Sequence, residues 1–307
     1  MLQYIHNKMY KYMNIDKILS SVRMSRALIG LDKKKFEELL ITFTQIYIEH
    51  LNNKKRIRIT GGGRKGKIKE PRQKLFFILF YLKNYPTFDV AAFLFASSKT
   101  QTNRWVLNIL PILKKTLGRE LVLPKRQIRT PEEFYSLFPG VKEVMIDGVE
   151  RPTIRTKNNK TQQKNYSGKK KRPTRKNDIL VDKTKKVLIL TPTKHGRVHD
   201  KKISDKFSLV TNIPKDVSIL ADTGFIGIDK QHPNTLIPKK KTKRNPLTDD
   251  DKQMNRLISS TRMKVENAIS GIKRYGAVAT IFRNKNGIDD LFMEIACGLW
   301  NFHLRRT

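Results

Sequence analysis

The chain has 307 residues, of which 64 are lysine or arginine and 27 are aspartate or glutamate, so its net charge is +37. Such an excess repels itself unless a polyanion neutralises it, which favours a nucleic-acid partner. The only cysteine is Cys297 and no apolar run could span a bilayer, which excludes an internal disulfide, a cysteine-rich zinc site and a membrane-spanning protein.

The N-terminal residues alternate apolar and basic side chains without the apolar core of a signal peptide, so we expect a soluble intracellular protein. Residues 14–52 are predicted to be helical, with Asp32 capping a helix of regularly spaced apolar side chains. Residues 54–69 are basic and glycine-rich, which indicates a linker. A Gly-x-x-x-x-Gly-Lys run in this linker imitates a phosphate-binding loop. Because Ile68 stands where the Mg²⁺-binding Ser or Thr is required, the sequence argues against ATP binding.

Three further helices are predicted between residues 70 and 118. Pro71 opens the first, Thr87 caps the second, and Ser98 begins a third that runs to about Leu117. The apolar side chains of the second helix that we expect to point inward are Val90, Phe93 and Leu94. A short helix, a tight turn and a longer helix are typical of a helix-turn-helix.

The third of these helices carries polar side chains in its first turns, where a recognition helix contacts base edges and phosphates. The candidate DNA-binding residues are Lys99, Gln101, Asn103 and Arg104. A plain helical bundle is the alternative interpretation, and the net charge favours DNA binding over it.

Two apolar strands are each predicted to end in an aspartate, with a glycine one or two residues later. The first lies within residues 141–150 and ends at Asp147, and the second lies within residues 217–224 and ends at Asp222. An aspartate after a strand is also common at an ordinary turn. The repetition of the pattern, with a third acid at Glu266, indicates instead a cleft that could hold a pair of hard divalent cations.

A densely basic segment, residues 155–175, follows the first of these strands. It is either a solvated hairpin or a contact with the DNA backbone. The residues proposed for that contact are Lys169, Lys170, Lys171 and Arg172. Strands at 177–181 and 187–190 are predicted to complete an antiparallel meander with the first strand.

Two histidines, His195 and His199, have the spacing of a zinc site. The glutamate of a metalloprotease motif is missing, and Gly196 interrupts any helix between them. We therefore predict that His199 and Asp200 begin a helix and bind no zinc.

Thr248 and Asp251 form a capping box for a long helix. At about 100° per residue, Arg262, Glu266 and Lys273 share one narrow face of that helix. The adjoining face, which we expect to be buried, carries Ile258, Val265, Ile269 and Ile272. Glu266 thus lies at the border between buried and open faces, where a helix across a sheet edge would place a metal ligand. An exposed Arg–Glu pair is the alternative.

Together these pieces resemble the DDE transposases of bacterial insertion sequences, in the insertion sequence 5 group related to eukaryotic Harbinger elements. The segments that carry the resemblance are Ile146-Asp147-Gly-Val-Glu-Arg-Pro152, Tyr166-Ser-Gly-Lys-Lys-Lys-Arg172, Gly196-Arg-Val-His199-Asp200, Leu220-Ala-Asp222-Thr-Gly-Phe225 and the spacing of Arg262, Glu266 and Lys273. Residues 85–105 resemble the helix-turn-helix that precedes the nuclease domain in this family. The family places a tyrosine where this chain has Ser259, so a contact to DNA or to metal-bound phosphate is in doubt.

The resemblance implies an α+β protein. Residues 1–69 would be an N-terminal helical region with a basic linker, and residues 70–138 an all-α helix-turn-helix DNA-binding domain. Residues 139–307 would form an RNase H-like mixed α/β catalytic domain. We also expect a bacterial protein of the cytoplasm, associated with the nucleoid.

The same resemblance implies the chemistry. Asp147, Asp222 and Glu266 would form a DDE triad that holds two Mg²⁺, with Mn²⁺ as a substitute. Arg262 and Lys273 would contact the phosphate of the transposon end. The implied partners are double-stranded DNA, at transposon ends and target, and further copies of the chain as a homo-oligomer on DNA. Two alternatives are a catalytically silent, transposase-derived DNA-binding protein and a general basic nucleic-acid-binding protein.

Overall fold

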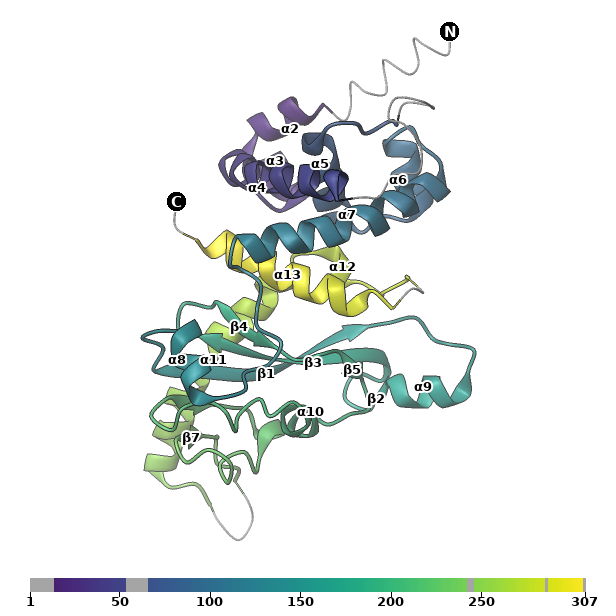
Figure 1. Ribbon diagram of the computed structural model, residues 1–307. Helices are drawn as coiled ribbons and strands as arrows, with labels where there is room; N and C mark the ends of the chain where they lie inside the picture. Colours follow the sequence, from purple (N-terminus) through teal and green to yellow (C-terminus); the bar gives the residue numbers. More distant parts are fainter. Residues whose placement is uncertain (1–13, 54–65, 242–245, 285–286, 306–307) are drawn as a thin grey trace. The chain divides into compact units, whose positions relative to one another are not determined.

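The protein divides into two compact units, shown in a computed structural model (Figure 1). The first comprises residues 1–123 with 274–277, and the second comprises residues 124–273 with 278–307. The structure describes residues 14–53, 66–241, 246–284 and 287–305. No helix within these ranges is long and apolar enough to cross a membrane.

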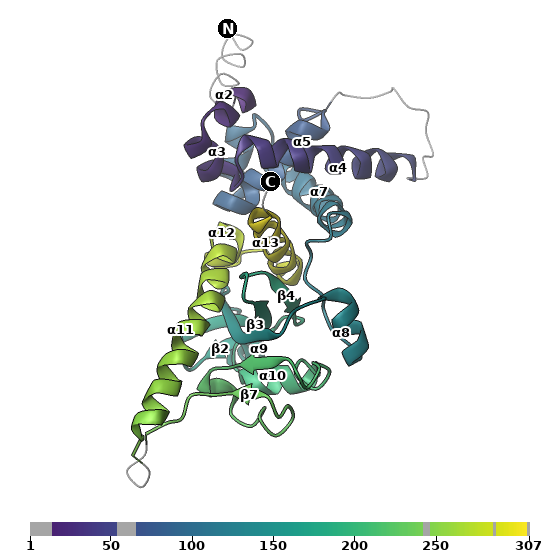
Figure 2. The ribbon, with the colours of Figure 1, turned by 90° about the vertical axis from the view of Figure 1, so that its left-hand side faces the viewer.

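The first unit is helical, as the sequence predicts (Figure 2). Asp32, Thr87 and Ser98 cap helices as predicted, because each side chain accepts a backbone N–H from the first turn. Pro71 occupies the first position of its helix, as expected. The main helices are α2 (Ile15–Ser20), α3 (Val22–Ile29), α4 (Lys33–Asn52), α5 (Pro71–Asn84), α6 (Phe88–Leu94) and α7 (Lys99–Arg119).

An aromatic cluster sets the angle between α5, α6 and α7. Phe77 of α5 meets Phe95 edge-on at 4.9 Å and Trp105 at 5.3 Å between ring centroids. Phe95 also packs edge-on against Phe80. Since Phe95 lies in the turn between α6 and α7, these rings fix the turn against α5.

The inward face of α6 differs from the prediction. Val90 and Phe93 are 49% and 69% exposed, whereas Ala91 and Ala92 are buried. Small side chains let α6 approach α7 closely, and the larger apolar residues are left on the outside. The expectation that Val90 and Phe93 point inward is therefore wrong.

The second unit contains, within its described residues, a seven-stranded mixed sheet in the order β2-β3-β1-β6-β7, with β4 and β5 also paired to β3. β1 is antiparallel to β3 and parallel to β6, and β3 is antiparallel to β4, which confirms the predicted meander. The strands are β1 (Glu143–Pro152), β2 (Tyr166–Ser167), β3 (Arg172–Asp182), β4 (Val187–Leu190), β5 (Lys194–His195), β6 (Ser218–Leu220) and β7 (Thr235–Leu236).

β1 does not end at Asp147 as predicted. It continues to Pro152, because β3 is long enough to pair with it as far as Thr174. Asp147 therefore lies in mid-strand, opposite Ile179. The second aspartate agrees better with the prediction, since Asp222 lies two residues beyond the end of β6.

Helices cover the sheet on both faces. α11 contacts β1 and β3, α13 contacts β4, and α10 contacts β3. α11 and α13 approach closely at Gly271, where a methyl group would lie 2.3 Å from the Trp300 ring. The predicted capping box of α11 and the predicted start of α10 at His199 are confirmed. The helices are α8 (Pro131–Leu137), α9 (Asn159–Asn165), α10 (Asp200–Lys206), α11 (Asp249–Ile272), α12 (Gly276–Ala279) and α13 (Asp289–Leu304).

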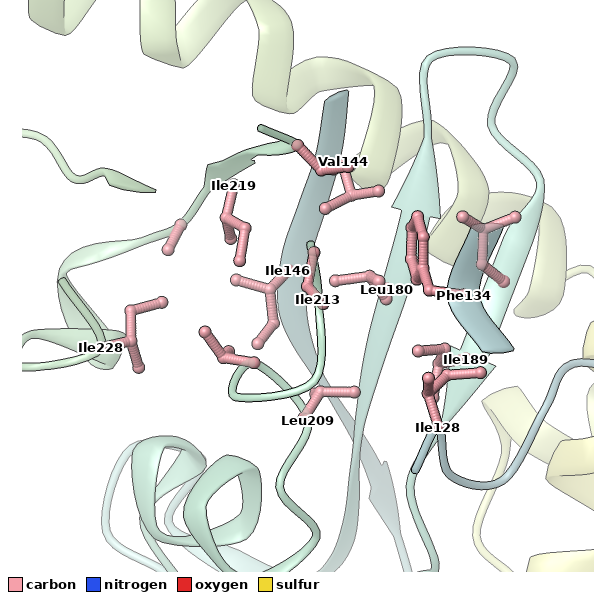
Figure 3. Close-up of a cluster of buried hydrophobic side chains, with 14 of the residues drawn as sticks. Ile128, Phe134, Val144, Ile146, Leu180, Ile189, Leu209, Ile213, Ile219 and Ile228 are labelled. Atoms are coloured by element: carbon pink, nitrogen blue, oxygen red, sulfur yellow. The ribbon is translucent and has the colours of Figure 1, made fainter. Parts of the chain in front are cut away.

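One face of β1 and β3 packs into an apolar core (Figure 3). Val144 and Ile146 of β1 and Leu180 of β3 are fully buried there. Because strand side chains alternate between faces, this even-numbered set points away from Asp147. The core holds β1 rigidly, and the side chain of Asp147 projects from the other face of the strand.

The compact units divide the chain differently from the three expected segments. Helices α3 and α4 pack against α5 and α7, so residues before 70 join the helix-turn-helix in one unit. Lys125 exchanges backbone hydrogen bonds with Leu188 and Leu190 of β4, so the chain enters the second unit at about residue 124. Most of the predicted linker lies outside the described residues, but Ile68 at its end is buried.

Candidate active site

A cleft of about 520 Å³ opens in the second unit where β1, the end of β6 and α11 meet. Acidic and basic side chains line it together. The acids are Asp147, Glu150, Asp200, Asp222 and Glu266, and the cations are Lys169, Lys170, Lys176, Lys240, Arg262 and Lys273. All three predicted acids thus line one cleft, together with both cations predicted on α11.

The sheet register brings the two aspartates together. Met145 of β1 is paired with Leu220 of the parallel strand β6. Asp147 and Asp222 each follow two residues later, so Asp222, just beyond the end of β6, lies beside Asp147 in mid-strand of β1. In both, a carboxylate oxygen accepts the N–H of the next residue, at 2.7 Å from Gly148 N and at 2.6 Å from Thr223 N.

Arg262 of α11 lies between the two aspartates. Its guanidinium nitrogens are 3.7 Å from Asp147 Oδ2 and 3.5 Å from Asp222 Oδ1. The side chain of Arg262 is only 15% exposed, so its charge is poorly screened by water. Burial raises the pKa of Asp147, while the Gly148 N–H and Arg262 act in the opposite direction.

The remaining residues of the α11 face also reach the cleft. Glu266 lines it with an exposed side chain, one turn after Arg262. Lys273 caps the end of α11, and burial together with the neighbouring Lys170 lowers the pKa of its amine. The predicted buried face is also present, since Ile258, Val265 and Ile272 are buried and Ile269 is partly buried. The shared face of Arg262, Glu266 and Lys273 is therefore confirmed. Ser259 lies on the exposed surface of the same helix.

The cleft fits divalent cations by its donor chemistry. Carboxylate oxygens are the ligands that Mg²⁺ and Mn²⁺ prefer, and Asp147, Asp222 and Glu266 supply them from three elements. The position of Arg262 shows that a positive charge is favoured between the aspartates. Among the described residues, no three acidic, histidine or cysteine side chains are gathered into a ready ligand set. The carboxylates would therefore have to turn toward a bound ion.

The basic segment contains a hairpin, as one of the two alternatives predicted, because β2 pairs antiparallel with the start of β3. It also contains α9, which was not predicted, and the hairpin turn places Lys171 at a φ of 52°. Lys169 and Lys170 line the cleft, whereas Lys171 and Arg172 are exposed beyond it. Two of the four predicted contact residues thus lie beside the triad.

In the first unit, the four candidate recognition residues lie in the first two turns of α7. Lys99 and Arg104 are exposed, and Gln101 and Asn103 are partly buried. Lys99 forms an exposed ion pair with Asp89 of α6 at 2.9 Å. Arg104 is a second exposed cation on the same two turns.

Four charged cleft residues were not predicted as functional, namely Glu150, Lys176, Asp200 and Lys240. Lys176 of β3 lies 3.1 Å from Asp200 and 4.0 Å from Glu150. Asp200 belongs to the His-Asp pair noticed in the sequence, but it was interpreted only as the start of a helix. No sequence signal marks Lys176, because it is one of many lysines.

Of the two histidines with zinc-like spacing, His195 is hydrogen-bonded to Arg175 and Asn165 through Nδ1.

Comparison with known proteins agrees with this architecture. Residues 146–301 match the family described as DDE superfamily endonuclease, and residues 66–119 match the helix-turn-helix of DDE superfamily endonuclease. The first match spans half of the chain and all three acids, so the chain belongs to the DDE superfamily endonucleases. The α+β fold, with a helix-turn-helix ahead of a mixed sheet-and-helix endonuclease domain, is thereby confirmed.

The chain is also similar to the probable transposase for insertion sequence element IS702 of Microchaete diplosiphon. The two are 28% identical over 232 residues, which cover 74% of this chain and 78% of that protein. No solved structure matches the chain. The placement in the insertion sequence 5 group stays a prediction.

Proposed function

We propose that this protein is a transposase that binds the terminal inverted repeats of its own insertion sequence and catalyses Mg²⁺-dependent strand cleavage and strand transfer. The observation that carries the proposal is the parallel register of β1 and β6, which sets Asp147 beside Asp222 in a cleft that Glu266 also lines. The family membership and the similarity to an insertion-sequence transposase support it.

Asp147, Asp222 and Glu266 would hold the divalent ions, as the DDE resemblance implies. The bound metal would activate a water or a DNA 3′-hydroxyl as nucleophile and stabilise the leaving 3′ oxygen. Arg262 orients the two aspartate carboxylates from the side of α11. The surrounding sheet core keeps these groups in place, which favours a rate gain from positioning.

The lysines of the cleft would bind the DNA backbone. Lys170 and Lys273 are close enough for one to lower the pKa of the other, so a phosphate between them would relieve their repulsion. Lys169 and Lys240 line the same cleft. The helix-turn-helix would supply end recognition through Lys99, Gln101, Asn103 and Arg104 on α7.

The reaction also suggests an assembly and a location. Strand transfer joins two element ends to one target, so we propose that the chain acts as a homo-oligomer on DNA. Its substrate would be chromosomal, which places it with the nucleoid in the cytoplasm of a bacterium.

The test is cleavage of DNA that carries the flanking inverted repeats of the gene. We expect nicks at the repeat ends with Mg²⁺ or Mn²⁺, none with a chelator, and none on a scrambled repeat. Specific binding without cleavage under any divalent ion would indicate a silent, transposase-derived DNA-binding protein. Equal binding to repeat and scrambled DNA would indicate a general basic nucleic-acid-binding protein.

A further inference from the structure

The carboxylate of Asp200 packs tightly against Gly148 and lies near Gly224. A methyl group on Gly148 would lie 3.0 Å from Asp200 Cγ and 3.2 Å from both of its carboxylate oxygens. A methyl group on Gly224 would lie 3.8 Å from Asp200 Oδ2. Gly148 immediately follows Asp147 and Gly224 follows Asp222 by two residues, so Asp200 packs against the chain beside Asp147 and lies near the chain beside Asp222.

Asp200 is itself held in place by Lys176. The ammonium of Lys176 lies 3.1 Å from Asp200 Oδ1, and only 12% of the lysine side chain is exposed. Glu150 supports the same lysine at 4.0 Å, and its other oxygen accepts a hydrogen bond from Thr174 at 2.5 Å. A half-buried ion pair of this kind keeps its geometry better than a solvated one, because water screens it less.

The helix that carries Asp200 is anchored between the two aspartate segments. α10 packs against β3 and against the 3-10 turn Thr223–Phe225 that follows Asp222. Ile203 on α10 is fully buried. A shift of Asp200 would therefore be transmitted to β1 through Gly148 and to the turn through Gly224.

We propose that Asp200 is a positioning residue, which sets the spacing of Asp147 and Asp222 by packing against Gly148 while its helix packs against the turn that follows Asp222 and Lys176 holds its carboxylate. This inference rests on the proposed function, since the spacing matters only if the two aspartates share metal ions. Asp200 touches the backbone beside the triad and acts on the site through it. Partners that orient metal ligands typically change metal affinity or activity by about 10- to 100-fold when removed.

The test compares four variants with the full-length wild type. Asp200→Ala removes the packing, Lys176→Met removes the tether, and the double variant removes both. Asp205→Ala is the matched control, because Asp205 lies on the same helix but forms an ion pair with Lys201, at 2.7 Å, and does not contact the triad. Mn²⁺ affinity is measured by electron paramagnetic resonance, and single-turnover cleavage is measured on pre-bound end DNA.

We expect Asp200→Ala to weaken Mn²⁺ binding and slow cleavage by about 10- to 100-fold, with end-DNA affinity changed less than about twofold. Lys176→Met should show a smaller loss in the same direction. The double variant should be no worse than Asp200→Ala, because the lysine acts through the aspartate. The Asp205→Ala control should match the wild type in both measurements.

Several results would overturn the inference. These are wild-type Mn²⁺ affinity in Asp200→Ala, losses that simply add in the double variant, or an equal loss in Asp205→Ala. If Asp200→Ala does not fold, Asp200→Asn keeps the shape and loses the ion pair, and it should show the smaller loss of Lys176→Met. A wild type that binds Mn²⁺ but cuts no end DNA would contradict the proposed function, while the Mn²⁺ comparison would still decide the role of Asp200.

Discussion

The two units build their candidate sites in opposite ways. In the first, the residues proposed to contact DNA follow one another on two turns of α7, so local sequence places them. In the second, Asp147, Asp222 and Glu266 come from a strand, a turn and a helix separated by 75 and 44 residues of sequence, and only the fold brings them to one cleft. A surface on a helix tolerates change at single positions, whereas an assembled site depends on every element that positions it.

The ion pairs of the two units also differ, in how far they are exposed to water. The Lys99–Asp89 pair on the first unit is about two-thirds exposed on both sides, and such pairs contribute about 0–1 kcal/mol. The Lys176–Asp200 pair in the cleft is mostly buried. Losing one partner of a buried pair leaves a charge without compensation, which costs more. Substitutions should therefore have larger effects in the second unit.

The largest effect is expected for Asp147→Asn or Asp222→Asn. An amide keeps the shape of the side chain but brings no negative charge to a metal ion, so cleavage should fall by about 10³-fold or more. Binding to end DNA should stay within about threefold, because the helix-turn-helix is untouched. Cleavage at the wild-type rate with Mg²⁺ in either variant would show that the triad assignment is wrong.

A smaller but still large loss is expected for Glu266→Asp. Buried Ile258, Val265 and Ile272 fix α11 against the sheet, so a side chain one methylene shorter must fall short by about 1 Å. Mg²⁺ requires ligands at about 2.0–2.1 Å in octahedral geometry, and a misplacement of this size costs on the order of 10²-fold.

Replacing Mg²⁺ by Mn²⁺ distinguishes the effect of side-chain length at position 266 from the effect of side-chain charge. Mn²⁺ is less strict in geometry and should restore part of the activity of Glu266→Asp but none of that of Glu266→Gln. The measurement is single-turnover cleavage of pre-bound end DNA with each metal. Near-wild-type Mg²⁺ rates for Glu266→Asp would mean that Glu266 belongs only to the helix surface.

Local signals in the sequence predicted most of the elements. Capping side chains such as Asp32, Thr87 and Thr248 mark helix starts through hydrogen bonds to the next turn, which involve only neighbouring residues. The angular spacing on α11 likewise placed Arg262 with Glu266. These predictions succeeded because their causes lie within a few residues of sequence.

The failures at the cleft depend on distant partners. β1 continues past Asp147 because β3 pairs with it. β3 begins in a segment so basic that its sequence predicts an exposed surface segment and no paired strand. Val149, in the part of β1 beyond Asp147, is fully buried. The roles of Lys176 and Asp200 in the cleft also follow from the register of β3 and the packing of α10. No sequence pattern distinguishes Lys176 from the other lysines, and Asp200, although it lies in a segment that carries the family resemblance, was interpreted only as the start of a helix.

Asp178→Asn tests the interior of the second unit without touching the triad. Asp178 is fully buried on β3, and burial together with the nearby Asp200 carboxylate raises its pKa well above the usual value. A raised folded-state pKa means that the folded protein retains a proton the unfolded chain loses. Stability therefore falls as pH rises from the unfolded pKa of about 4 toward the folded pKa.

Asparagine has no such proton, so the variant should gain stability relative to the wild type across that pH window, by about 1 kcal/mol or more at pH 8. Urea denaturation between pH 4.5 and 8 measures the difference. Asp205→Asn is the control, and its stability relative to the wild type should change with pH in the opposite direction. Although burial raises the pKa of Asp205, hydrogen bonds from Lys201 and Gln231 lower it overall. A pH-independent difference between wild type and Asp178→Asn would show that the buried group is ionised in the folded protein.

The smallest effect is expected for Arg104→Ala on the first unit. Arg104 is exposed in the second turn of α7, so its removal disturbs no packing and should weaken end binding by only about 5- to 10-fold, the cost of one base or phosphate contact. Lys115→Ala is the matched control, because it removes the same charge from the same helix at about 16 Å along the axis. That control should change the affinity less than twofold.

Gel-shift titrations of the full chain without divalent metal, on repeat and scrambled DNA at two salt concentrations, measure both variants. If Arg104 contacts a phosphate, affinity falls equally on both DNAs and the salt slope decreases by about one. If it contacts a base, the loss is confined to the repeat. Equal behaviour of the two variants would mean that α7 attracts DNA by charge alone and that recognition of the ends lies elsewhere in the chain.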